Sequence, residues 1–159
     1  MRIAKEYEKR MGRRWCKSSR RLMGGLLVAG VAVGGTAYAQ PLAEAAERQN
    51  RRAVRSLLAE SVDVDAAQPD GATALHWAAH WNDLEMTTHL IEAGANADVV
   101  NDLGVTPLAL AALNGGLKVA DALLAAGADA NAARSSGETV LMTAAKTGNV
   151  TLVRSLLVR

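Results

Sequence analysis

The residues best suited to do chemistry are two histidines, His76 and His80, which lie four positions apart. On a helix this spacing can bring two imidazoles to one metal ion, because residues four apart share a face. The sequence gives the pair little support, since no cysteine follows it and the positions 33 residues later hold Ala109 and Leu113. No phosphate-binding Gly-rich loop, Gly-x-Ser-x-Gly motif, dinucleotide fingerprint or thiolate nucleophile is present. We therefore predict no catalytic, cofactor or metal site, and retain a small metal- or ligand-binding periplasmic module as an alternative.

The segment that contains these histidines recurs along the chain with a period of 33 residues. Gly71, Thr73 and Leu75 return at positions 104, 106 and 108, and again at 137, 139 and 141. An alanine pair begins at positions 45, 78, 111 and 144. Glycine permits a tight turn, threonine can cap the helix that follows, and apolar residues at helical spacing come next. Each copy is thus expected to form a turn, two short helices and a loop, and to bury its apolar face only against its neighbours.

This period, together with Thr73-Ala74-Leu75-His76-Trp77-Ala78, resembles the ankyrin repeat. The resemblance covers roughly residues 40–159 and implies an all-α ankyrin-repeat solenoid of about four helix-turn-helix repeats joined by β-turn loops. The expected repeats are residues 40–68, 69–101, 102–134 and 135–159. His76 stands where the family commonly has a structural histidine that bonds across the turn region. For function, the family implies a non-enzymatic scaffold whose partner is another protein.

The same resemblance indicates where a partner would bind. In the family, the turn tips and the positions just after the alanine pair face the concave side and vary to fit a partner. The partner-binding residues expected here are Asp70, Ala72, His80, Trp81, Leu103, Val105, Leu113, Asn114, Glu138 and Lys146. Trp81 has two interpretations: an exposed apolar contact centre inside a polar rim, or a side chain that folds onto the neighbouring repeat and replaces missing core.

The positive charge of the chain is concentrated at its beginning. Residues 1–21 contain nine Lys and Arg against two Glu, a charge of +7, which leaves −5 for the rest of a chain whose net charge is +2. The sequence pI of 8.9 therefore describes the leader, and a nucleic-acid partner is not expected. Later in the chain, Arg48, Arg51, Arg52 and Arg55 form a cluster that is either a solvated end of the repeat stack or a docking patch for an acidic partner.

The leader has the form of a secretory signal peptide. Its basic segment is followed by an uncharged stretch, residues 22–39, with small residues at Ala37 and Ala39. We expect residues 1–39 to be the signal peptide, cleaved after Ala39, and residues 40–159 to be the mature domain. The only cysteine, Cys16, precedes the apolar stretch, so the mature chain has no disulfide to form. These features predict a periplasmic or secreted bacterial protein, with a secreted effector that acts on a host protein as an alternative. An inner-membrane anchor, with the signal segment uncleaved, is the other localisation considered.

Overall fold

The computed structural model describes residues 41–158. The chain divides into two units, Met1–Ala37 and Tyr38–Arg159, and every described residue belongs to the second. The predicted signal peptide, residues 1–39, lies outside the described residues. Among residues 41–158, no helix is long and apolar enough to cross a membrane.

Within residues 41–158, eight helices form four pairs whose starting residues repeat every 33 positions. The first helices of the pairs are α2 (Pro41–Glu47), α4 (Ala74–His80), α6 (Pro107–Leu113) and α8 (Val140–Thr147). The second helices are α3 (Arg51–Ala59), α5 (Leu84–Glu92), α7 (Leu117–Ala125) and α9 (Val150–Leu157). The described residues contain no named strand, only an isolated antiparallel bridge between Ala133 and Thr139. The all-α solenoid of four repeats predicted from the sequence is therefore confirmed.

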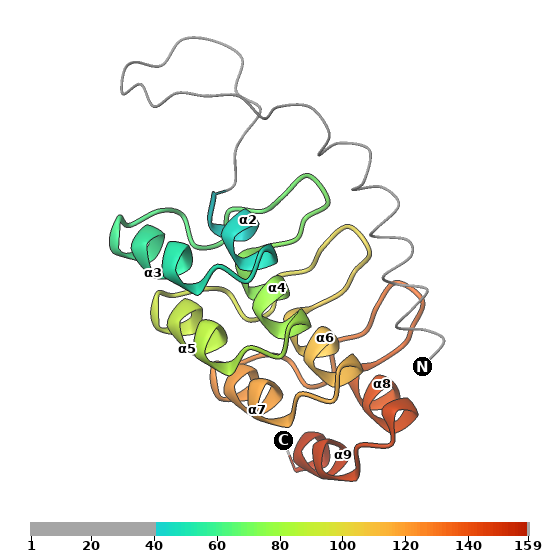
Figure 1. Cartoon of the computed structure of the whole chain (residues 1–159). Coiled ribbons are helices and arrows are strands. Elements are labelled where there is room, and N and C mark those ends of the chain that lie inside the picture. The colour runs from blue at the N-terminus through green and yellow to red at the C-terminus, as the bar shows by residue number, and fades with distance from the viewer. Residues whose placement is uncertain (1–40, 159) are drawn as a thin grey trace. The chain divides into compact units, whose positions relative to one another are not determined.

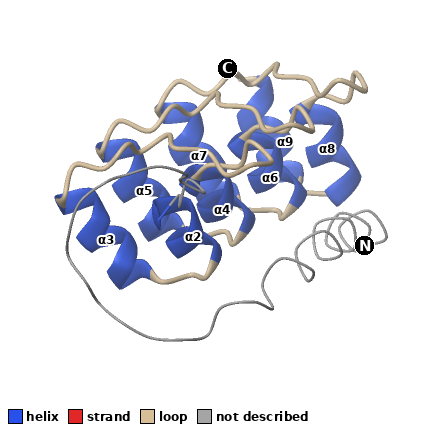
Figure 2. Ribbon diagram, turned by 90° about the horizontal axis from the view of Figure 1, so that it is seen from above, coloured by secondary structure: helices blue, strands red, loops and turns tan. Residues whose placement is uncertain are grey.

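The helices stack in two parallel rows, which Figures 1 and 2 show from two directions. We call α2, α4, α6 and α8 the inner row, and α3, α5, α7 and α9 the outer row. Each helix contacts its partner within the pair and the equivalent helix of the next pair. The connections between repeats project beyond the inner row (Figure 1). Each repeat is thus covered mainly by its immediate neighbours, as expected for a solenoid.

Capping residues fix where the helices begin. The Thr106 and Thr139 hydroxyls accept hydrogen bonds from the third helical N–H groups of α6 and α8. Before α5 the same role falls to the carboxylate of Asp83, and before α9 to the amide of Asn149. The turn before α4 uses Gly71, whose φ of +78° favours glycine and whose Cβ would lie 3.0 Å from the Asn101 Cα.

The core runs along the stack between the two rows. Leu75 and Leu108, which share a position in the repeat, are both completely buried. Their burial confirms the predicted inward face. The last repeat differs, because Met142 is 54% exposed whereas His76 and Ala109, at the same position, are 2% and 4% exposed. Burial at this position therefore depends on a following repeat that stacks over it.

Loop carboxylates fasten successive repeats to one another. Asp65 accepts a hydrogen bond from the backbone N–H of Asn96 at 3.0 Å, and Asp98 accepts one from Asp129 at 2.7 Å. Each of these acceptors lies 31 residues before its donor, so one bond type is repeated at two junctions. These loop residues are structural, because their oxygens bond to the backbone of the neighbouring repeat.

Candidate protein-binding surface

Trp81 lies at the end of α4 and is held from two sides. Its indole Nε1–H donates to the backbone carbonyl of Glu47 in the preceding repeat, at 3.1 Å. Its ring stacks on Trp77, with 6.5 Å between centroids, and the ring of His80 meets it edge-on at 4.7 Å. Trp81 nevertheless remains 41% exposed. The side chain therefore packs on the neighbouring repeat and still presents a large apolar area to solvent.

The hydrogen bond made by Trp81 belongs to a series that runs along the inner row. The side-chain amide of Asn114, at the equivalent position of the next repeat, donates to the His80 carbonyl at 2.7 Å. Both bonds reach a carbonyl 34 residues earlier. Asn114 was predicted only as a binding residue, and the structure gives its exposed side chain a role in the repeat junction as well. The sequence signal for that role is that Trp81 and Asn114 lie 33 residues apart, at equivalent positions of two repeats, and that both side chains carry an N–H donor.

Two of the predicted binding residues are buried. Ala72 is 4% exposed and Val105 is 1% exposed. The prediction that these side chains face a partner was wrong, because each follows its turn tip and points into the stack. The backbone of Val105 is also occupied, since its N–H donates to Asn101 and its carbonyl accepts from His76.

The other predicted residues lie at or near the surface. Leu103 is 54% exposed at the turn tip of its repeat, and Leu113 is half-buried at the end of α6. Asp70 is half-buried and accepts a hydrogen bond from the Ala72 N–H at 3.1 Å. Within this set, His80 lies directly beside Trp81, and the side chain of Asn114 donates to the His80 carbonyl.

Glu138 and Lys146 pair with each other in the last repeat. The Lys146 Nζ lies 2.7 Å from a Glu138 carboxylate oxygen, and the Arg134 guanidinium lies 3.6 Å from the other. The hydrogen bond from Lys146 is the main cause of the lowered pKa of Glu138. This carboxylate is therefore largely compensated by cations of its own chain.

His76 is a structural residue of the junction between the second and third repeats. Its Nδ1 accepts from the Thr73 N–H at 3.1 Å, and its Nε2 lies 2.9 Å from the Val105 carbonyl, so the proton belongs on Nε2. Burial lowers the pKa of His76, against the opposing effects of the Val105 hydrogen bond and of Asp70. Because both ring nitrogens are engaged, His76 cannot ligate a metal without breaking these bonds. Within residues 41–158, no group of three His, Cys, Asp or Glu is arranged to hold one.

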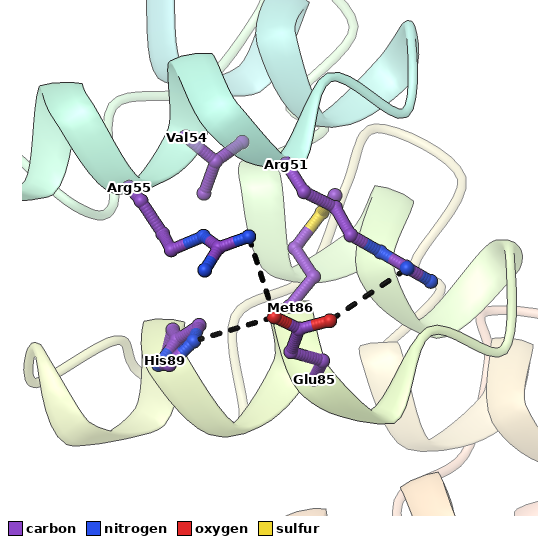
Figure 3. A pocket seen from close by; sticks show the side chains of 6 residues that line it. All are labelled: Arg51, Val54, Arg55, Glu85, Met86 and His89. Atoms are coloured by element: carbon purple, nitrogen blue, oxygen red, sulfur yellow. Dashed lines mark ion pairs between the residues drawn. The ribbon is translucent and has the colours of Figure 1, made fainter.

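The arginine cluster meets acidic residues of the next repeat. Arg51 Nε lies 2.6 Å from Asp83, whose carboxylate is nearly buried, and both Arg51 and Arg55 approach Glu85, at 3.6 and 3.5 Å. Figure 3 shows these two arginines and His89 around Glu85, beside a shallow surface depression between α3 and α5. The arginines are thus committed in part to joining two outer helices, which weakens the interpretation of this cluster as a docking patch.

The stacked helix pairs, the projecting turns and the varied residues along one edge define an α-helical repeat protein with an extended surface. Sequence comparison specifies the family. The family model "Ankyrin repeats (3 copies)" matches residues 26–101, 42–134 and 82–159, and the chain belongs to the ankyrin-repeat family. Ankyrin repeats are generally protein–protein interaction modules, and the family is typically a non-enzymatic scaffold. A search of curated proteins finds no match to this chain.

Proposed function

We propose that this protein is a scaffold that binds another protein through its concave face, meaning the ends of the inner helices together with the turn tips. The observation that supports this most strongly is Trp81. A large aromatic side chain is 41% exposed, yet it is held in one orientation by the Glu47 carbonyl and by Trp77. Exposed aromatics that are already ordered lose little entropy on binding and are common anchors of interfaces.

The rest of the proposed surface has the composition of an interface. Leu103 supplies a second exposed apolar side chain, while Asn114 and His80 supply polar groups beside Trp81. Apolar anchors with polar surroundings are the usual arrangement in protein interfaces. On this proposal the chain itself performs no catalysis and requires no cofactor or metal.

Capture of partners on the immobilised full chain tests the proposal. Wild type, Trp81→Ala and Leu84→Ala are compared, because Leu84 is also exposed, at 38%, but begins α5 in the outer row. We expect Trp81→Ala to lose most of the capture and Leu84→Ala to retain it. Equal capture by all three folded proteins would contradict partner binding through the concave face.

Export is a separate part of the proposal. The basic leader and the uncharged stretch up to Ala39 support export with removal of residues 1–39, to the periplasm or the medium. N-terminal sequencing of the exported protein should begin at Gln40, whereas a full-length chain in the membrane fraction would contradict cleavage. Capture from a periplasmic extract compared with a host-cell lysate distinguishes a periplasmic scaffold from a secreted effector.

A further inference from the structure

The chemistry of the partner follows from what surrounds the apolar surface at Trp81. The indole N–H of Trp81 donates to the backbone carbonyl of Glu47. The Glu47 side chain therefore belongs to the same residue that holds the indole ring in place. That carboxylate accepts a hydrogen bond from Gln68 Nε2 at 3.2 Å. Gln68 also accepts from the Trp77 indole at 2.9 Å, which places Glu47, Gln68 and both tryptophans in one connected network.

Further carboxylates continue from this network along the turn tips. Asp70 follows Gln68 by two residues, and its carbonyl accepts from the Asp102 N–H at 3.0 Å, so the two aspartates lie on adjoining turns. Leu103, the second exposed apolar residue, is next to Asp102 in the chain. Acidic side chains therefore accompany the apolar residues from α2 to the third repeat.

These negative charges act on one another. Burial raises the pKa of Glu47, and the charges of Glu44 and Asp70 raise it further, against the Gln68 hydrogen bond and Arg48. Arg48, the cation that opposes this rise, also pairs with Glu44 at 3.4 Å. The contrast with Glu138 is informative, because that carboxylate is compensated by Lys146 and Arg134. Negative charge that Arg48 compensates only in part is thus concentrated at the Trp81 end of the surface.

We propose that the concave face binds a partner segment that carries a lysine or arginine, with the cation over the Trp81 indole and paired with Glu47 and Asp70. This inference rests on the proposed function and specifies the partner's chemistry. A cation over an indole face is attracted by the ring quadrupole, and neighbouring carboxylates strengthen its selection over neutral side chains. Arginine suits the site especially well, because its planar guanidinium can stack on the ring and bond to a carboxylate together.

A random dodecapeptide library displayed against the immobilised full chain tests this inference. The library is first depleted on the Trp81→Ala variant, so that the peptides retained are those that require Trp81. We expect them to be rich in arginine and lysine and poor in aspartate and glutamate. Replacing the key arginine of a selected peptide by citrulline, which keeps the shape but removes the charge, should weaken binding about tenfold.

The carboxylates are tested by isosteric changes. In the double variant Glu47→Gln/Asp70→Asn, each side chain keeps a hydrogen-bond acceptor, so the turn and the Gln68 contact can persist while two charges are lost. The control variant Glu60→Gln/Glu92→Gln removes two exposed charges at the ends of outer-row helices. We expect the first variant to bind the selected peptides about tenfold more weakly at low salt, and the control to remain within about twofold of wild type.

The outcomes separate the inference from the function on which it rests. Selected peptides without basic residues, or full binding after the citrulline change, would overturn the basic partner while leaving the Trp81 surface as a binding site. Equal losses in both double variants would also overturn it, since general charge would then explain the binding. A library in which no peptide survives depletion on Trp81→Ala would overturn both the inference and the proposed surface.

Discussion

Replacement of His76 by alanine tests how the repeat junctions are stabilised. The imidazole is 2% exposed and bonds to Thr73 in its own turn and to Val105 in the next repeat. When the imidazole is removed, the Val105 carbonyl still accepts a hydrogen bond from the Asn101 N–H at 3.2 Å. The loss therefore matters mainly for the backbone N–H of Thr73, which donates to the imidazole in the wild type. An unsatisfied buried donor costs about 1–3 kcal/mol, and the vacated volume adds to this.

The chain contains its own reference for this substitution. Ala109 occupies the same position in the next repeat, where the Thr106 hydroxyl accepts from the Ala109 N–H at 3.2 Å. In the His76→Ala variant the Thr73 hydroxyl can accept from the backbone N–H of residue 76 in the same way, but the Thr73 backbone N–H still loses its acceptor. We therefore expect a decrease of about 2–3 kcal/mol in the free energy of unfolding, measured by urea denaturation at pH 7.5.

The pH dependence of the same variant gives a second test. Because burial lowers the folded-state pKa of His76, both folded and unfolded forms are neutral above the ordinary value of about 6.5. Below that pH the unfolded chain binds a proton that the folded chain does not, so the free energy of unfolding falls until the folded-state pKa is reached. His76→Ala should lose stability less steeply than wild type between pH 7.5 and 5.5. Identical slopes for wild type and His76→Ala would refute this account of the junction.

Two further predictions concern packing and turn geometry. Leu108→Ala should lower the free energy of unfolding by about 2–5 kcal/mol in one cooperative transition, and Leu141→Ala by clearly less, because the second leucine is only half-buried; equal costs in denaturant melts would contradict the assigned inward face. Gly71→Ala should be more destabilising than Gly94→Ala in thermal melts, since both have positive φ but only the first Cβ would meet backbone, at Asn101; the reverse order would contradict the described contact between turns.

The sequence was sufficient to predict the repeat architecture. A period without insertions predicts equivalent helices at equal intervals, and the helices begin at exact 33-residue steps. The burial of Leu108 followed from the same alignment of repeats, whereas the structural bonding of His76 was expected from the resemblance to the ankyrin family. Such features are predictable because each is set by the local unit and by the requirement that units stack.

The contacts between repeats were harder to predict. The acceptor for Trp81, the carbonyl of Glu47, depends on how far each repeat is rotated relative to the last, which the residue types do not specify. The inward direction of the Val105 side chain was also missed, because side chains one or two residues apart near a turn tip can point in opposite directions. The pairing of Arg51 with Asp83 joins two polar residues from different repeats, and composition alone cannot choose between that pairing and a free patch.

The central claim is that Trp81 anchors a partner protein on the concave face. The most direct measurement is the affinity of a captured partner for wild type and Trp81→Ala, with the free energy of unfolding determined on the same samples. Loss of one exposed hydrogen bond and of the ring contacts with Trp77 and His80 should cost about 1–3 kcal/mol of stability, less than truncation of a fully buried tryptophan. The account predicts a folded variant whose affinity is at least about 30-fold weaker. A folded variant that binds the partner with wild-type affinity would contradict it.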